Sequence, residues 1–161
     1  MAMAIPMQTA TARLRVRYFI LLMLFVVTVL NYADRAIISI AGVPISQEFG
    51  INAVSMGYIL SAFSWSYVAA QLPGGWLLDR FGSKWVYAGS IFFWSLFTFA
   101  QGWAGFLGAG AAVAVFFGLR MLVGVAESPS FPGNARIVAA WFPRTQRGQA
   151  SAIFTAPQYF L

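Results

Sequence analysis

The sequence has no cysteine and no histidine, and only four of its 161 residues are acidic. Without cysteine it can form neither a disulfide scaffold nor a thiolate metal site. Without histidine it lacks the commonest metal ligand and the commonest acid–base residue of enzymes. Charged residues of both signs make up 9% of the chain, too few to solvate the surface of a globular domain. We expect no metal site, no cofactor and no enzymatic activity.

Apolar residues dominate the composition. Hydrophobic residues make up 60% of the chain and include 16 Phe, 6 Trp and 6 Tyr, which excludes a disordered chain. A helix needs about 20 mostly apolar residues to cross the bilayer core. Runs of this kind extend over about Tyr18–Ala41, Val54–Leu78, Trp85–Trp103 and Ala111–Phe142. A fifth run follows Arg147 and, at about 14 residues, is too short to cross. The sequence predicts an all-α membrane protein with four transmembrane helices and the start of a fifth.

The basic residues lie on one side of these predicted spans. Residues 1–17 contain three arginines and no acid, but the apolar run that follows is too long for a signal peptide. The loops around 46–52 and 101–110 have no Lys or Arg. The positive-inside rule then places the N-terminal segment 1–17 in the cytoplasm. It also explains the net charge of +6 without a nucleic-acid partner. The basic residues that flank the spans are Arg13, Arg15, Arg17, Arg80, Lys84, Arg136, Arg144 and Arg147.

Asp34, Arg35, Arg120 and Glu127 fall within the predicted spans, whereas Arg136 flanks the end of the fourth span. A charge in hydrocarbon costs several kcal/mol unless it faces a partner or water, so each is a functional candidate. Tyr32 precedes Arg35 by three residues, which gives one helix face a hydroxyl and a guanidinium suited to an anion. The alternative for Asp34 and Arg35 is a helix-end pair whose side chains extend to the membrane surface.

Arg120 and Glu127 are seven residues apart and share a helix face, with Gly124 between them. This spacing predicts an open slot with opposite charges at its ends. The alternative is a buried ion pair that only ties helices together. Pro129 and Pro132 follow, and they predict a kinked helix whose broken backbone lines a cavity.

The second span carries two patterns. Small residues at intervals of four predict close packing of another helix; they are Ala62, Ser66, Ala70 and Gly74. A separate polar line consists of Ser64, Tyr67 and Gln71. Its hydroxyl and amide groups suit either the hydroxyls of a substrate or a neighbouring helix, and the sequence leaves both open.

Residues 75–84 read Gly-Trp-Leu-Leu-Asp-Arg-Phe-Gly-Ser-Lys. This segment resembles the G-x-L-x-D-R-x-G-[RK]-[RK] signature of the major facilitator superfamily, with Ser83 where a basic residue is common. Arg120 and Gly124 resemble the R-x-x-x-G pattern of its fourth helix. The glycines permit a tight reversal, and Asp79 is suited to accept hydrogen bonds and cap a helix end. The residues of this cytoplasmic signature loop are Gly75, Asp79, Arg80, Gly82 and Lys84.

Four further segments, residues 31–35, 63–67, 71–76 and 126–134, resemble the anion:cation symporter branch of that superfamily. Within it the chain is most similar to bacterial glucarate and galactarate transporters, with galactonate and hexuronate transporters as near relatives. Members have about twelve helices in two halves. Residues 18–161 are therefore expected to be an incomplete N-terminal half, with the C-terminal half missing.

The resemblance implies roles for named residues. Asp34 and Glu127 match carboxylates that take up protons, and Arg120 matches the arginine that couples them. The positions that contact the sugar acid are matched by Tyr32, Arg35, Tyr67 and Gln158. We expect a proton-coupled symporter of sugar-acid anions in a bacterial inner membrane, working by alternating access. The alternatives are transport of another organic anion and a non-transporting four-helix membrane scaffold.

Overall fold

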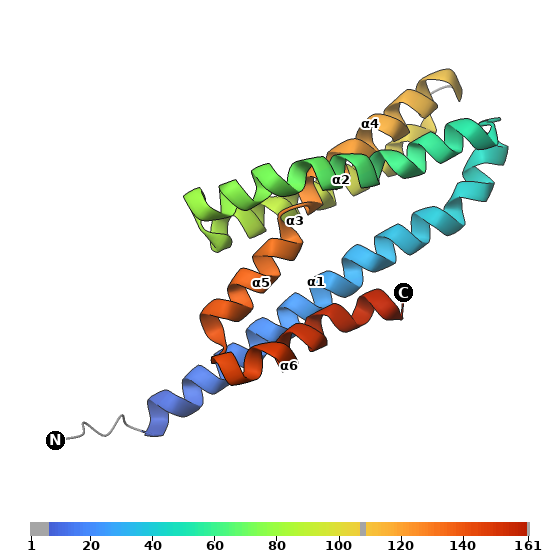
Figure 1. Cartoon of the computed structure of the whole chain (residues 1–161). Helices are drawn as coiled ribbons and strands as arrows, with labels where there is room; N and C mark the ends of the chain where they lie inside the picture. The colour runs from blue at the N-terminus through green and yellow to red at the C-terminus, as the bar shows by residue number, and fades with distance from the viewer. Residues whose placement is uncertain (1–6, 107–108, 161) are drawn as a thin grey trace. The chain divides into compact units, whose positions relative to one another are not determined.

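The computed structural model describes residues 7–106 and 109–160, and every regular element in those ranges is helical (Figure 1). This confirms the all-α class. Residues 1–6, 107–108 and 161, which belong to the predicted N-terminal segment, an uncharged loop and the end of the fifth run, lie outside the described residues. The elements are α1 (Met7–Glu48), α2 (Ala53–Phe81), α3 (Ser83–Trp103), the short 3-10 helix η1 (Ala104–Phe106), α4 (Ala109–Glu127), α5 (Ser130–Trp141), α6 (Arg144–Thr155) and the 3-10 helix η2 (Ala156–Tyr159).

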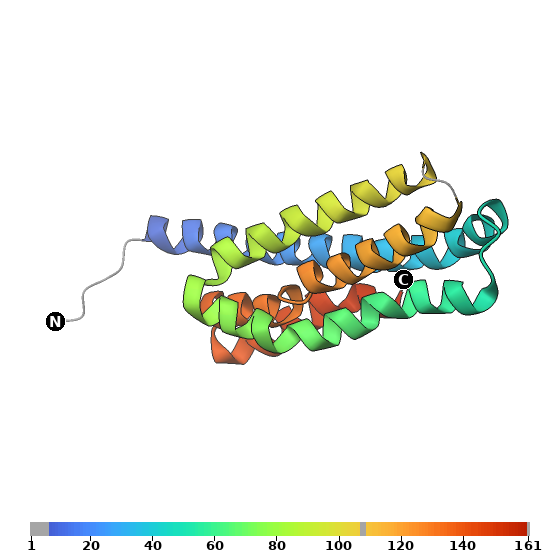
Figure 2. The same ribbon diagram turned by 90° about the horizontal axis from the view of Figure 1, so that it is seen from above.

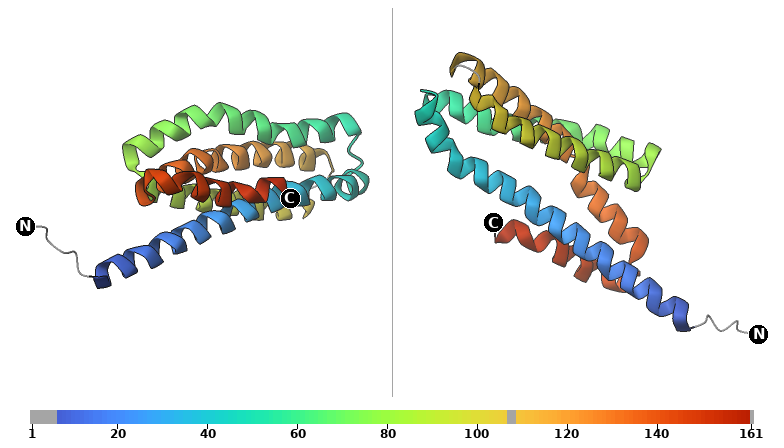
Figure 3. Two further views of the ribbon diagram at one scale, coloured as in Figure 1. Left: turned by 60° about the horizontal axis from the view of Figure 1, so that its bottom comes forward. Right: turned by 180° about the vertical axis from the view of Figure 1, so that it is seen from behind.

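The chain divides into two compact units. Unit 1 consists of the chain up to Asp34 and from Asn134 onward, and unit 2 consists of Arg35–Gly133. Within unit 2, α4 lies between α2 and α3, and the three helices run side by side (Figures 2 and 3). Within unit 1, α6 lies alongside the N-terminal half of α1 (Figure 1).

The predicted small-residue stripe is the face of α2 on which α4 packs. All four stripe residues are buried, and Ser128, in the turn that follows α4, donates its hydroxyl to the carbonyl of Ala70 at 3.1 Å. A methyl carbon at Gly74 would lie 3.3 Å from Pro129 Cγ, which shows how closely the chains approach. The packing interpretation of this stripe is confirmed.

The predicted kink in the fourth span is a complete interruption of the helix. The helix α4 ends at Glu127, residues 128 and 129 form a turn, and α5 begins at Ser130. Pro129 has no N–H with which to continue the α4 ladder. Pro132 lies in the first turn of α5, where its missing N–H would have no intrahelical acceptor. The break therefore depends on position 129, and Pro132 does not disrupt the backbone.

A single residue, Gly82, connects α2 to α3. Its φ of 78° belongs to the left-handed region that glycine adopts readily, and its N–H donates to the carbonyl of Leu78 at 3.1 Å. The predicted tight reversal is confirmed at this glycine, whereas Gly75 lies inside α2. The residue that precedes α3 is Gly82, which has no side chain to accept a hydrogen bond, so a capping role for Asp79 stays a prediction.

An arginine of α6 binds the C-terminal end of α5 in unit 1. Arg147 donates from Nε to the carbonyl of Phe142 at 3.0 Å and from Nη2 to the carbonyl of Ala139 at 2.6 Å. The last carbonyls of a helix have no intrahelical donors, so a guanidinium there satisfies them. The guanidinium of Arg17 lies over the ring of Phe142, 5.0 Å from its centroid. Two basic residues thus fix the junction between α5 and α6.

In the part of the chain that the structure describes, two segments are long and apolar enough to cross a membrane, Arg15–Glu48 and Ala111–Trp141. They correspond to the first and fourth predicted spans. The second and third predicted spans form α2 and α3, but their serine, glycine, tyrosine and tryptophan residues make them less hydropathic. The number of spans remains a prediction.

Candidate functional site

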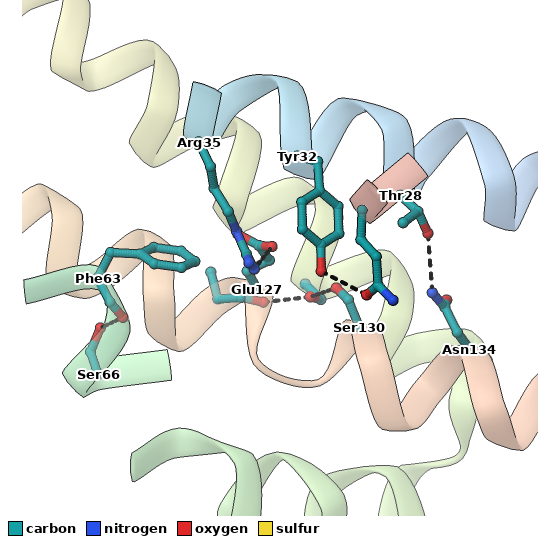
Figure 4. A network of polar contacts seen from close by, with 11 residues as sticks. Thr28, Tyr32, Arg35, Phe63, Ser66, Glu127, Ser130 and Asn134 are labelled. Atoms are coloured by element: carbon teal, nitrogen blue, oxygen red, sulfur yellow. Dashed lines mark hydrogen bonds and ion pairs between the residues drawn. The ribbon is translucent and has the colours of Figure 1, made fainter. Parts of the chain in front are cut away.

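An ion pair joins α1 to the end of α4 in unit 2. Arg35 Nη2 donates to Glu127 Oε1 at 2.6 Å (Figure 4). The Glu127 side chain is only 2% exposed, whereas that of Arg35 is 30% exposed. A buried carboxylate needs a charged or hydrogen-bonded partner, and the guanidinium supplies both. Arg35 binds another helix and does not extend out along α1, so the helix-end alternative does not describe it.

Aromatic rings contact two arginines of unit 2, Arg35 and Arg120. The guanidinium carbon of Arg35 lies 4.7 Å from the centroid of Phe63 and 5.2 Å from that of Tyr67. The guanidinium carbon of Arg120 lies 5.0 Å from the same Phe63 centroid. Phe63 and Tyr67 stack on each other with centroids 5.6 Å apart. Since the face of an aromatic ring attracts a cation, the rings stabilise both guanidinium charges.

The predicted open slot between Arg120 and Glu127 is wrong. A methyl carbon at Gly124 would lie 2.2 Å from Ser66 Oγ and 2.5 Å from the carbonyl oxygen of Phe63. The space beside this glycine is therefore filled by α2. A missing side chain permits close packing as well as a cavity, and here it permits packing.

Serine hydroxyls hold the turn that follows Glu127. Ser90 on α3 donates to the carbonyl of Ala126, and its oxygen lies 3.3 Å from that of Ser130 (Figure 4). Ser128 donates to the carbonyls of Ala70 and Val125. The Ser90 hydroxyl satisfies the carbonyl of Ala126, which in an uninterrupted helix would accept from a backbone N–H. The sequence reasoning missed these serines, since one small polar residue in an apolar run gives no signal of its partner.

A separate set of polar contacts lies within unit 1. Tyr32 donates its hydroxyl to Gln158 Oε1 at 3.2 Å, and Asn134 donates from Nδ2 to Thr28 Oγ1 at 3.4 Å (Figure 4). Tyr32 and Gln158 are half-buried, whereas Thr28 and Asn134 are buried. Two of the four residues predicted to contact substrate therefore bind each other in this unit.

The other predicted site residues divide between the units. Arg35 and Tyr67 are in contact in unit 2, which also holds Glu127 and Arg120. Asp34 is half-buried and belongs to unit 1, whereas Glu127 belongs to unit 2. The two predicted proton carriers therefore belong to different units. Within the described ranges no three acidic side chains gather to hold a metal ion.

The signature loop lies at an exposed end of unit 2. Asp79, Arg80 and Lys84 are exposed, and the guanidinium of Arg80 lies 5.3 Å from the centroid of Trp76. The ammonium of Lys84 lies 5.3 Å from the centroid of Trp85. Charged heads over indole rings are typical of side chains at a membrane boundary.

A family model and the most similar curated proteins point to the same protein family. The family described as Major Facilitator Superfamily matches residues 24–160. The probable galactarate/D-glucarate transporter of Pseudomonas putida is 68% identical over 146 residues, which are 91% of this chain and 32% of that protein. That of Bacillus subtilis is 60% identical over 90% of this chain and 32% of its own length. The D-galactonate transporter of Escherichia coli O6:H1 is 42% identical over 98% of this chain and 35% of its own length. The chain thus spans about a third of these relatives.

Proposed function

The chain belongs to the Major Facilitator Superfamily, and from this membership we propose that it is part of a proton-coupled symporter of sugar-acid anions. Proteins of this family are transporters, not enzymes. The remaining helices of an approximately twelve-helix bundle would come from sequence outside this chain. Transport would proceed by alternating access in a bacterial inner membrane.

The ion pair between Arg35 and Glu127 is the observation that carries the proposal. While Glu127 is ionised, its carboxylate occupies the guanidinium of Arg35. Protonation of Glu127 removes that attraction and frees the guanidinium to bind a carboxylate of the substrate. Proton and anion would then favour each other's binding, which is the coupling that symport requires.

The charge balance of the four ionisable residues supports the same scheme. Asp34 and Glu127 carry two negative charges and Arg35 and Arg120 carry two positive charges, so the sum is zero when all are ionised. Protonation of both carboxylates leaves two positive charges, which favours an anion. Asp34 and Glu127 are thus our proposed proton carriers, and Arg120 is the proposed coupling arginine.

We assign hydroxyl recognition to three polar side chains, Tyr32, Tyr67 and Gln158. Tyr67 contacts Arg35, and Tyr32 binds Gln158. These groups suit a substrate rich in hydroxyls, and the relatives named for galactarate, D-glucarate and D-galactonate support a sugar acid. We propose that Arg35 binds the substrate carboxylate, while Tyr32, Tyr67 and Gln158 bind its hydroxyls.

Of the alternatives, the membrane scaffold is disfavoured by one observation. It would oligomerise through the small-residue stripe of α2, and α4 already packs on that stripe. Transport of a different organic anion remains the second candidate, because the ion pair would serve any carboxylate.

An uptake assay tests the proposal. A full-length transporter that carries this segment is reconstituted in liposomes, and uptake of radiolabelled glucarate is measured with and without an inward proton gradient. We expect accumulation only with the gradient, and competition by galactarate. Accumulation that is independent of the proton gradient would refute coupling. Competition by unrelated organic anions, with none by sugar acids, would favour the second candidate.

A further inference from the structure

One phenyl ring, that of Phe63, contacts both Arg35 and Arg120 in unit 2. The guanidinium carbons of Arg35 and Arg120 lie 4.7 Å and 5.0 Å from the centroid of Phe63. Phe63 is 5% exposed and Arg120 is 3% exposed, so this ring and the second guanidinium are enclosed by protein. The two arginines come from different helices, α1 and α4, and the ring comes from α2. The ring of Phe63 therefore links side chains of α1 and α4 to α2.

The backbone fixes the ring against α4. The carbonyl oxygen of Phe63 packs against Gly124, where a methyl carbon would come within 2.5 Å of it. The same oxygen accepts a hydrogen bond from Ser66 Oγ at 3.0 Å (Figure 4). Arg120 precedes Gly124 by four residues, or about one turn of helix, so this contact also sets the ring relative to Arg120. On its other side the ring stacks on Tyr67.

A ring and a carboxylate affect a cation differently. A carboxylate cancels the charge of an arginine, whereas the face of a phenyl ring attracts the guanidinium and leaves its full charge in place. Two guanidinium groups repel each other, so a neutral attractive group between helices makes it easier to keep both in one unit. This property is useful where positive charge must be kept for a ligand.

We propose that Phe63 is a positioning residue that holds Arg35 and Arg120 and preserves their positive charge for an anionic substrate. The inference rests on the proposed function for the identity of the ligand. The placement of the two guanidinium groups is a separate claim, which is testable without any substrate.

Substrate binding is the first test. In the full-length transporter, Phe63→Leu keeps an apolar side chain without an aromatic face, and we expect the Kd for glucarate to rise about tenfold. Phe63→Tyr keeps the face and should restore binding to near the wild-type value. Phe116→Leu is the matched control, since Phe116 is equally buried but packs on Phe49 in an apolar cluster. Wild-type affinity in Phe63→Leu, or an equal loss in Phe116→Leu, would overturn the inference.

The second test does not involve the substrate. Phenylglyoxal modifies arginines, and mass spectrometry measures its reaction at Arg120. We expect faster modification of Arg120 in Phe63→Leu than in wild type, Phe63→Tyr or Phe116→Leu. If Phe63→Leu fails to fold, Phe63→Met supplies an unbranched apolar replacement. Unchanged reactivity of Arg120 would overturn the inference. A wild-type protein that binds no sugar acid would refute the proposed function, while this arm would still decide the role of Phe63.

Discussion

Glu127 Oε1 lies 2.6 Å from Arg35 Nη2, and the two side chains differ in their exposed fraction. Glu127 is 2% exposed, so its carboxyl group is stable there either as a carboxylate with a charged partner or as a neutral, protonated acid. Arg35 is 30% exposed and retains a surface that a ligand could reach. The pair therefore has two favourable states: an ion pair, or a protonated acid beside an available guanidinium.

The first prediction concerns the proton on Glu127. Glu127→Gln keeps the size and hydrogen-bonding capacity of the side chain but fixes it in a neutral state, as in the protonated acid. We expect the full-length variant to bind glucarate and to exchange it across the membrane, but to lose accumulation driven by a proton gradient. Counterflow and gradient-driven uptake in proteoliposomes measure the two activities separately.

Glu48→Gln is the control for this variant. Glu48 is an exposed acid at the end of α1, so its neutralisation should leave both activities unchanged. If Glu127→Gln concentrates glucarate as well as the wild type does, the coupling proton does not reside on Glu127.

The second prediction concerns the shape of the Arg35 side chain. Arg35→Lys keeps the positive charge but loses the planar fork that meets a carboxylate with two hydrogen bonds. Losing one charge-assisted hydrogen bond costs about 2 kcal/mol, so we expect the Kd for glucarate to rise roughly 30-fold. Isothermal titration calorimetry on the purified full-length protein measures this change.

Two comparisons make this result specific. Arg15→Lys changes an exposed arginine of α1 and should not alter binding. Tyr67→Phe removes one hydroxyl and should cost about 1 kcal/mol, which is less than Arg35→Lys. Unaltered affinity in Arg35→Lys would mean that Arg35 serves only the structure.

The third prediction concerns the contact between α2 and α4. The methyl group in Gly124→Ala would meet Ser66 Oγ and the carbonyl oxygen of Phe63, and a backbone carbonyl cannot move aside cheaply. Overpacking of this kind costs about 1–3 kcal/mol, so the midpoint of thermal unfolding should fall. Tryptophan fluorescence of the purified full-length protein follows that transition.

Gly118→Ala is the matched control, because no described atom lies within 4 Å of the added methyl group. Alanine favours a helix over glycine by up to about 1 kcal/mol, so this variant should be as stable as the wild type or more so. Ser66→Ala should rescue Gly124→Ala only in part, since the Phe63 carbonyl remains. Equal stability of the two glycine variants would contradict the close contact.

Features that depend only on residues close together in the sequence could be predicted from it. The stripe from Ala62 to Gly74 and the break at Pro129 follow from helix periodicity and from the missing N–H of proline. The partner of Glu127 could not be predicted, because Arg35 is 92 residues away and nothing local specifies which helix it faces. The error at Gly124 has the same origin, because whether its space is empty depends on where α2 lies.

The last prediction concerns orientation in the membrane, which rests on the one-sided placement of the basic residues. The chain has no cysteine, so a cysteine introduced into a cysteine-free full-length transporter reports on one position. Ala53 at the start of α2 is exposed and lies in a predicted external loop. It is a better position than Asn52, whose side chain caps α2 by accepting from the N–H of Ser55 at 2.8 Å. Thr145 at the start of α6 is exposed on the predicted cytoplasmic side.

We expect an impermeant maleimide to label Ala53→Cys in intact cells and to leave Thr145→Cys unlabelled. In inside-out vesicles the pattern should reverse, which shows that both thiols are reactive. Arg144 and Arg147 flank position 145, and moving them across the membrane would oppose the positive-inside preference. Labelling of Thr145→Cys in intact cells, with Ala53→Cys protected, would invert the proposed orientation and place residues 1–17 outside the cytoplasm.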